Sequence, residues 1–160
     1  FPARPPRRPS PKMPERTEEA RRFLLGLLEL VGEEKGTVEV VPEEGRLYVN
    51  LRGPFHTFPT DPDFREALAH ILRLFLRRHG GRVALLLDVN GKLKAREMEL
   101  VSRARELAER ALKEGRKIEL EPMPAAERRL IHLALADHPG VRTYSVGQGN
   151  KRHVVIEPRK

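Results

Sequence analysis

The stretch Glu-Arg-Arg-Leu-Ile-His at residues 127–132 predicts the helix around which the C-terminal part of this chain is built. Pro124 suits the first position of a helix because its missing N–H would have no partner there, and Pro139-Gly140 ends the segment. Arg128 and His132 stand four residues apart, so their side chains project from one face of this helix. Apolar residues recur at helical spacing on another face, which we expect to pack against a core: Ala126, Leu130, Leu133 and Ala134.

An Arg-x-x-x-His spacing alone is also compatible with a solvated helix face, since the two residues meet at this spacing by chance in many helices. The flanking sequence adds information. Strands are predicted at residues 117–120, 142–146 and 153–156, the last two as a hairpin. The whole pattern over residues 96–160 resembles the small single-stranded nucleic-acid-binding domain named for its Arg-x-x-x-His signature, in the form found at the C-terminus of the bacterial Jag (SpoIIIJ-associated) family.

This resemblance implies a protein that binds single-stranded RNA or DNA, with RNA favoured, and that reads little sequence. Arg128 offers a planar fork of donors that fits a phosphate, and His132 can donate a ring N–H to the same backbone. Because a protonated imidazole binds an anion more strongly, binding should strengthen as the pH falls through about 6.5. Further cations, and one aromatic ring for stacking on a base, are expected on this surface: Arg129, Arg142, Lys151, Arg152 and Tyr144.

Charge is distributed unevenly along the chain. The formal net charge is +8, and there is no cysteine, which excludes disulfides and thiolate metal sites and fits a reducing cytoplasm. Residues 1–16 hold five basic and one acidic residue, residues 17–95 twelve of each, and residues 96–160 fourteen basic and ten acidic residues. The positive excess at both ends favours an anionic partner, whether nucleic acid, acidic protein or anionic lipid. Plentiful arginine, glutamate and proline with a single glutamine are typical of proteins from heat-loving organisms.

The N-terminal part is predicted to be a linker followed by a small mixed domain. Residues 1–16 are basic and rich in proline, so we expect an extended linker, with Thr17 as the N-cap of the first helix. Helices are expected at residues 17–31, 61–80 and 94–114, and strands at residues 37–41, 46–51 and 82–89. This order of elements is that of the type II K-homology fold, which Jag relatives carry at this place.

The K-homology resemblance lacks the residues that bind nucleic acid. These domains clamp the backbone with a Gly-x-x-Gly loop, because only glycine lets phosphates approach consecutive backbone N–H groups. No Gly-x-x-Gly occurs in this chain, and residues 52–63 instead contain several prolines together with Asp61 and Asp63. With the zero net charge of residues 17–95, this predicts a domain without the usual site. Phe55 and Phe58 are candidates for stacking on bases, but we favour packing within the protein or against a partner.

We therefore predict an α+β chain in three parts. Residues 1–16 form the linker, and residues 17–95 a type II K-homology-like domain with the order α-β-β-α-β-α. Residues 96–160 form the Arg-x-x-x-His domain, a small α/β domain with a three-stranded sheet and the signature helix. The helix at residues 96–114 is an element that the two domains can share.

The sequence indicates a binding protein rather than an enzyme. The six histidines show no compact ligand spacing, and no nucleophile elbow or Walker-type loop is present. We expect neither a metal nor a cofactor. No apolar run approaches the ~20 residues of a membrane span, so a cytoplasmic protein is expected.

The alternative is a protein-interaction adaptor. The resemblance implies association with a membrane protein insertase and with control of cell elongation and division, and the K-homology domain of the family can pair with a second small K-homology protein. In this interpretation the neutral domain at residues 17–95 is an interface, either to such a partner or in a homodimer, and the protein reaches the membrane through its partners.

Overall fold

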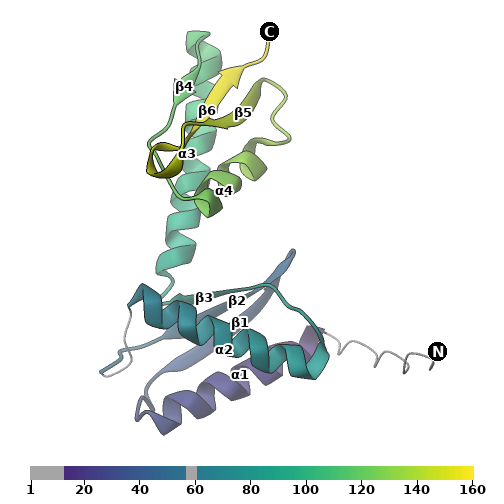
Figure 1. The fold of residues 1–160 in the computed structure, drawn as a ribbon, viewed down its shortest axis with the longest axis vertical. Coiled ribbons are helices and arrows are strands. Elements are labelled where there is room, and N and C mark those ends of the chain that lie inside the picture. Colours follow the sequence, from purple (N-terminus) through teal and green to yellow (C-terminus); the bar gives the residue numbers. More distant parts are fainter. Residues whose placement is uncertain (1–12, 57–60) are drawn as a thin grey trace, which may run out of the picture. The chain divides into compact units, whose positions relative to one another are not determined.

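Figure 1 shows the computed structural model, in which residues 13–56 and 61–160 are described. The chain is of the α+β class, as predicted, and its described strands form two separate three-stranded sheets. It divides between Leu93 and Lys94 into two compact units. Residues 1–12, most of the predicted linker, lie outside the described residues.

The N-terminal unit is a three-stranded sheet with two helices. Its elements are α1 (Met13–Leu30), β1 (Thr37–Glu43), β2 (Arg46–Arg52), α2 (Pro62–Gly80) and β3 (Leu85–Val89). The sheet order is β1-β2-β3, with β1 antiparallel and β3 parallel to β2. A parallel pair needs a crossover connection, which α2 provides. The element order agrees with the predicted one, but many small α+β domains share it, so the K-homology assignment stays a prediction.

The start of the first helix differs from the prediction. α1 begins at Met13, four residues before the expected cap Thr17 and inside the predicted linker. Pro14 does not prevent this, because a proline in the first turn of a helix removes an N–H that has no helical partner there. At α2 the expected cap is confirmed, since the Asp61 carboxylate accepts from the backbone N–H groups of Asp63 (2.7 Å) and Phe64 (3.2 Å).

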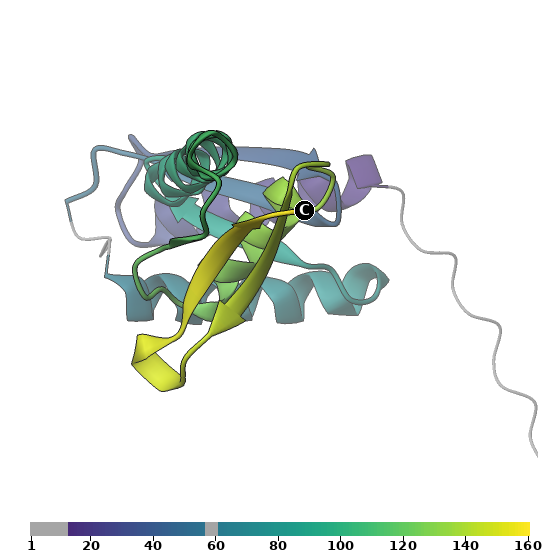
Figure 2. The same cartoon turned by 90° about the horizontal axis from the view of Figure 1, so that it is seen from above.

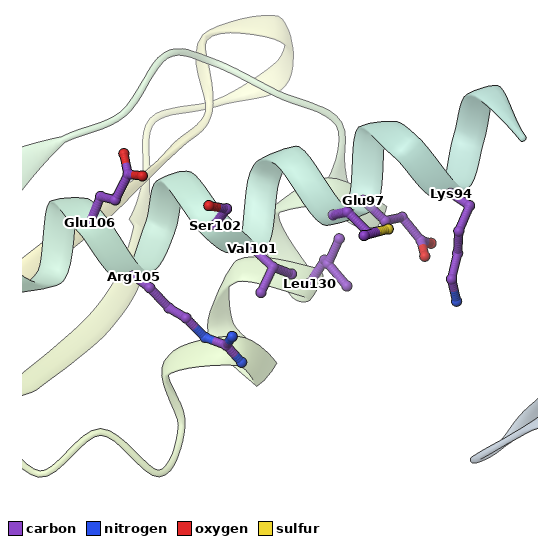
Figure 3. A pocket seen from close by; sticks show the side chains of 8 residues that line it. Lys94, Glu97, Val101, Ser102, Arg105, Glu106 and Leu130 are labelled. Atoms are coloured by element: carbon purple, nitrogen blue, oxygen red, sulfur yellow. The ribbon is translucent and has the colours of Figure 1, made fainter.

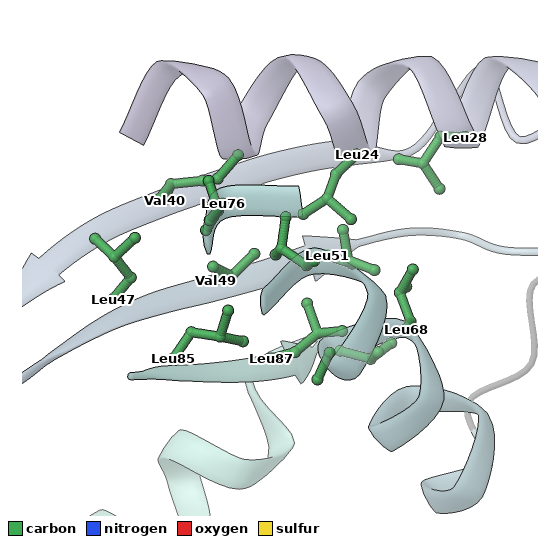
Figure 4. Close-up of a cluster of buried hydrophobic side chains, with 14 residues drawn as sticks. Leu24, Leu28, Val40, Leu47, Val49, Leu51, Leu68, Leu76, Leu85 and Leu87 are labelled. Carbon is green, nitrogen blue, oxygen red and sulfur yellow. The ribbon is translucent and has the colours of Figure 1, made fainter. Parts of the chain in front are cut away.

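Helices α1 and α2 cover one face of this sheet, and leucine and valine side chains fill the layer between them (Figures 1 and 4). The strand β3 is buried on both faces along most of its length, as its apolar run predicts. Phe55 packs against the same core, in line with the favoured interpretation of this ring, whereas Phe58 lies outside the described residues. Every element supplies buried residues to this core, among them Leu24, Leu28, Val40, Leu47, Val49, Leu51, Leu68, Leu72, Leu76 and Leu87.

A buried polar cluster fixes the end of β3. Asp88 is fully buried, and one of its carboxylate oxygens accepts from the Tyr48 hydroxyl at 2.8 Å. The other oxygen accepts from the backbone N–H groups of Val89 (2.8 Å) and Leu93 (2.9 Å). The Asn50 side chain accepts from the N–H of Gly91 at 3.0 Å. These bonds hold the turn from β3 into the next helix against β2.

The C-terminal unit contains α3 (Lys92–Glu114), β4 (Ile118–Glu119), α4 (Ala125–Leu135), β5 (Val141–Val146), the short 3-10 helix η1 (Gly149–Lys151) and β6 (His153–Pro158). Its sheet has the order β4-β6-β5 with both pairs antiparallel. The predicted hairpin is therefore present, and Figure 2 shows β5, the η1 turn and β6 in succession. Residues of α3, α4, β5 and β6 form one core, among them Leu100, Ala104, Ala108, Ile131, Leu135, Val141, Val154 and Ile156.

The buried face of α4 is not the one that the sequence predicts. Leu133 and Ala126, both expected in the packing stripe, are exposed, with Leu133 at 63%. Ile131 and Leu135 are buried instead, one helical turn apart. Two apolar stripes compete on this short helix, and the spacing alone does not say which of them meets the sheet.

Candidate nucleic-acid interface

His132 lies half-buried on α4, facing β5, and both of its ring nitrogens have partners within the protein. Nδ1 is 2.7 Å from Thr143 Oγ1, and Nε2 is 2.9 Å from Ser145 Oγ. Thr143 and Ser145 are two residues apart on β5, so their side chains stand on the same face of the sheet. In the ligand-free structure both ring nitrogens are therefore engaged within the protein. That His132 donates its own N–H to a phosphate stays a prediction.

The environment of His132 disfavours its charged form. Partial burial lowers the pKa of the ring below its usual value, and the positive charges of Arg128 and Arg152 lower this pKa further. The ring of the ligand-free chain is therefore expected to become protonated below the ordinary value of about 6.5, while the pH dependence of binding stays a prediction.

A groove of about 530 Å³ opens beside His132 and follows β5. Three arginines, Arg142, Arg152 and Arg159, line it together with Tyr144. No carboxylate is among its lining residues within the part of the chain that the structure describes. The remaining lining residues are His132, Leu135, Ala136, Val141, Thr143 and Ser145.

Each arginine of the groove is held by one acceptor of the protein. Arg142 pairs with Glu157, with Nη2 at 2.6 Å from Oε2, and its guanidinium lies 5.8 Å from the centre of the Tyr144 ring. Arg152 donates from Nη1 to the carbonyl of Gly147 at 2.9 Å, and Arg159 donates from Nε to the carbonyl of Val141 at 3.0 Å. Since a guanidinium has five N–H donors, these bonds orient the groups without exhausting their donors.

The other predicted site residues lie around this groove rather than in it. Arg128 donates from Nε to the carbonyl of Met123 at 3.1 Å, which holds its guanidinium near the start of α4 and near His132. Arg129 and Lys151 are exposed and do not line the groove. The structure thus brings His132, Arg142, Tyr144 and Arg152 together, places Arg128 beside them, and leaves the other two outside.

Three polar lining residues were not predicted: Thr143, Ser145 and Arg159. The two hydroxyls alternate on a predicted strand next to the signature helix, which is a usable but weak signal. Arg159 follows the last predicted strand, and only the pairing of Val141 with Pro158 brings it beside the start of β5. That register could not be read from the sequence.

A second groove, of about 480 Å³, runs along α3 and differs in character (Figure 3). Met98, Val101 and Leu130 give it an apolar floor, and Glu97 and Glu106 line it as well. Lys94 and Arg105 line it too, so its charges are mixed, whereas the charged residues that line the groove beside β5 include three arginines and no carboxylate. Among residues 13–56 and 61–160, no group of three or more histidine, aspartate or glutamate side chains is arranged to hold a metal ion. The helices in these same ranges include none with the length and apolar character to cross a membrane.

Comparison with known proteins identifies the domain that contains this groove. The model of the Arg-x-x-x-His (R-three-H) domain matches residues 98–158, which include His132 and nearly all of its groove. Similar proteins named RNA-binding protein KhpB come from Bacillus subtilis (32% identical over 135 residues, 81% of this chain and 61% of the relative) and Lactiplantibacillus plantarum (35% over 96 residues, 59% and 30%). A third, from Streptococcus pneumoniae, is 34% identical over 80 residues, 50% of this chain and 24% of the relative.

This chain therefore spans less than two thirds of the length of these relatives. The domain match falls on the segment whose Arg-x-x-x-His pattern the sequence singles out, and the match to the Bacillus subtilis protein extends well beyond it, over 81% of the chain. The chain is of the bacterial Jag (SpoIIIJ-associated) type, and its C-terminal unit matches the Arg-x-x-x-His domain.

Proposed function

We propose that this chain is a non-catalytic protein that binds single-stranded nucleic acid, RNA in the first place, in the groove beside His132. The observation that carries the proposal is the lining of that groove, to which Arg142, Arg152 and Arg159 all contribute and in which no carboxylate stands among the described lining residues. The match to the Arg-x-x-x-His domain and the relatives named RNA-binding protein KhpB support RNA as the ligand class.

Binding of this kind is directed at the backbone of the strand. Guanidinium groups bind phosphate oxygens through paired, charge-assisted hydrogen bonds, and such contacts orient a strand without reading its bases. Tyr144, in contact with the Arg142 guanidinium, offers a ring on which one base can stack whatever its identity. The proposed interface should therefore bind single strands of different base sequence with similar affinity.

The test is a titration of labelled single-stranded RNA and DNA with the wild-type chain and an Arg128→Ala/Arg152→Ala variant. Each arginine lost from a charge-assisted bond costs about 1.5–3 kcal/mol, so the variant should bind at least tenfold more weakly. The matched control is Arg105→Ala/Lys113→Ala, which removes the same charge from exposed positions on α3. Equal weakening by both variants would reject the groove as the binding site.

A role as a protein-interaction adaptor is the second candidate, and it concerns the N-terminal unit. Ile71 and Leu74 on α2 are about half exposed, at 51% and 49%, and a groove of about 410 Å³ lies beside Leu74. Apolar side chains exposed on one helix face are typical of a partner surface. Light scattering on the wild-type chain and on Ile71→Asp tests it, because a shift from dimer to monomer would locate a self-association surface on α2.

A further inference from the structure

We propose that Thr143 and Ser145 are the side chains that hold a phosphate of the bound strand, and that His132 is a positioning residue that directs their hydroxyl protons. This inference rests on the proposed function and assigns the contacts within it. It transfers the direct contact from the imidazole to the two hydroxyls that flank it.

The geometry carries the first step. The ring of His132 stands between the two hydroxyls, 2.7 Å from Thr143 Oγ1 and 2.9 Å from Ser145 Oγ, and all three residues line the arginine groove. Both hydroxyl-bearing residues are only partly buried and line the groove, so a ligand in the groove can approach them. A ligand that enters the groove meets the hydroxyls without having to break the bonds of the ring.

The number of protons on the His132 ring determines which hydroxyl keeps a free O–H. A neutral imidazole has one N–H donor and one acceptor nitrogen. The hydroxyl that faces the acceptor nitrogen must donate its only proton to the ring, whereas the hydroxyl that faces the ring N–H accepts from it and keeps its own O–H free. Either tautomer therefore leaves one O–H donor directed away from the ring. In the protonated ring both nitrogens donate, and both hydroxyls then have a free O–H.

The surrounding charges identify the acceptor that these O–H groups meet. Cationic groups approach from α4 (Arg128), from β5 (Arg142) and from the residues that precede and follow β6 (Arg152 and Arg159). The carboxylate of Glu157, on the strand beside β5, is paired with Arg142. Donors without a protein acceptor in a positive groove select an anionic oxygen, and a phosphodiester has two non-bridging oxygens to offer.

Substitution of the hydroxyls tests the assignment on the full chain, with a short labelled oligouridylate as the probe. Thr143→Val removes the hydroxyl but keeps the shape of the side chain, and Ser145→Ala removes only the hydroxyl oxygen. Thr143→Ser keeps the hydroxyl and removes the methyl group. Because a neutral ring leaves one of the two hydroxyls free, we expect the double variant Thr143→Val/Ser145→Ala to weaken binding by roughly tenfold, as for loss of a hydrogen bond to a charged group, and Thr143→Ser to bind like wild type. Ser102→Ala, on the exposed side of α3, is the matched control.

A double-mutant cycle separates positioning from direct contact. If His132 acts through the hydroxyls, His132→Ala added to Thr143→Val/Ser145→Ala should weaken binding little further. If the imidazole itself contacts the phosphate, the losses should multiply, and the assignment is overturned. Thermal melting confirms that each variant is folded. Where a variant is not folded, the ring nitrogen shifts of His132 in the wild-type chain decide between the two contacts. At a pH at which the ring stays neutral in the complex, these shifts should remain those of a hydroxyl-bonded ring when RNA is added.

Failure of this inference differs from failure of the proposed function. A wild-type chain that does not bind the probe rejects both. A wild-type chain that binds, loses affinity with Arg128→Ala/Arg152→Ala, and keeps it with Thr143→Val/Ser145→Ala retains the function but removes the hydroxyls from it. In that case the bonds to His132 serve only to fasten α4 to β5, and the same double variant should lower the melting temperature alone.

Discussion

At the scale of single residues, the protonation of His132 gives a direct prediction. Burial and the two neighbouring arginines lower its pKa in the folded, ligand-free chain. The ring should therefore titrate below the ordinary value of about 6.5 in an NMR titration of the free protein. Arg152→Ala should move this pKa upward, since it removes one of the positive charges. A ring that titrates at or above 6.5 in the wild-type chain would contradict the environment described above.

The same pKa sets the sign of two pH effects. Below about pH 6.5 an unfolded chain takes up a proton at His132 that the folded chain resists, so this residue makes the fold less stable as the pH falls. A bound phosphate reverses the preference, because it stabilises the imidazolium. The pKa of His132 should therefore be higher in the RNA complex than in the free chain. RNA binding should strengthen as the pH falls from the first of these two pKa values to the second, and should level off below it.

The buried pair of Tyr48 and Asp88 gives a prediction on stability. Burial, together with the hydrogen bond and the charge of Asp88, raises the pKa of Tyr48, so the hydroxyl remains a donor to the carboxylate. Tyr48→Phe removes this donor from a buried charge and should lower the free energy of unfolding by about 1.5–3 kcal/mol. Denaturant unfolding of the N-terminal unit, followed by the amide signals of β2, measures it.

The control for Tyr48→Phe is an exposed pair on the same sheet. Glu39→Gln breaks the ion pair of Glu39 with Arg52, which spans 2.9 Å between Oε2 and Nη2 but is open to solvent on both sides. Such pairs contribute about 0–1 kcal/mol. If the two substitutions cost the same, the cluster around Asp88 does not hold the end of β3 as we describe.

At the scale of elements, the turn of the β5–β6 hairpin controls the position of Arg152. Gly147 has φ +90°, and a Cβ at this residue would lie 2.9 Å from the carbonyl oxygen of Lys151, which is part of the backbone. Gly149 also has a positive φ, of +57°, but a Cβ there meets no atom within 4 Å. Gly147→Ala should therefore reshape the turn, whereas Gly149→Ala should cost only about 1–2 kcal/mol of local strain.

Because the carbonyl of Gly147 accepts from Arg152, a reshaped turn should move this arginine and weaken RNA binding. We expect Gly147→Ala to bind several-fold more weakly than Gly149→Ala in the same titration. Similar affinities for the two variants would show that the turn does not determine the position of the Arg152 guanidinium.

The elements also show what sequence patterns determine. Strong signals gave the right element order: the cap at Asp61, the apolar run that becomes β3, and the turn residues between β5 and β6. The errors arose where two local solutions compete. Pro14 is compatible with a linker and with the first turn of a helix, and on α4 the apolar residues allow two buried faces, so tertiary packing decides between them.

The residues of the candidate site also fall into two groups, those that the sequence predicts and those whose position depends on tertiary packing. His132, Arg142 and Arg152 were predictable because a helix beside a hairpin places their elements next to one another. The hydroxyl partners of His132 were not, since they depend on how β5 lies against α4, and Arg129 shows that a residue adjacent to Arg128 in sequence points elsewhere on the helix. The role of each of these residues in binding stays a prediction until the titrations are made.

At the scale of the whole molecule, the charge distribution separates a local site from general attraction. Residues 17–95 carry twelve basic and twelve acidic residues, and the positive excess lies in residues 1–16 and 96–160. A chain that binds RNA through its net charge would respond to the loss of any cation. A chain that binds in the groove should respond to Arg142, Arg152 and Arg159 far more than to cations on α3.

Salt dependence measures this difference. If three or four phosphates are engaged, log affinity plotted against log salt concentration should have a slope of about −2 to −3 for single-stranded RNA. Arg142→Ala should make this slope shallower by about 0.7, because one phosphate contact is lost, whereas Arg105→Ala should leave it unchanged. Since Glu157 would then lose its partner and repel the strand, Arg142→Ala/Glu157→Gln should keep the shallow slope while recovering part of the affinity. A flat salt response in the wild-type chain would remove phosphate contact as the basis of binding.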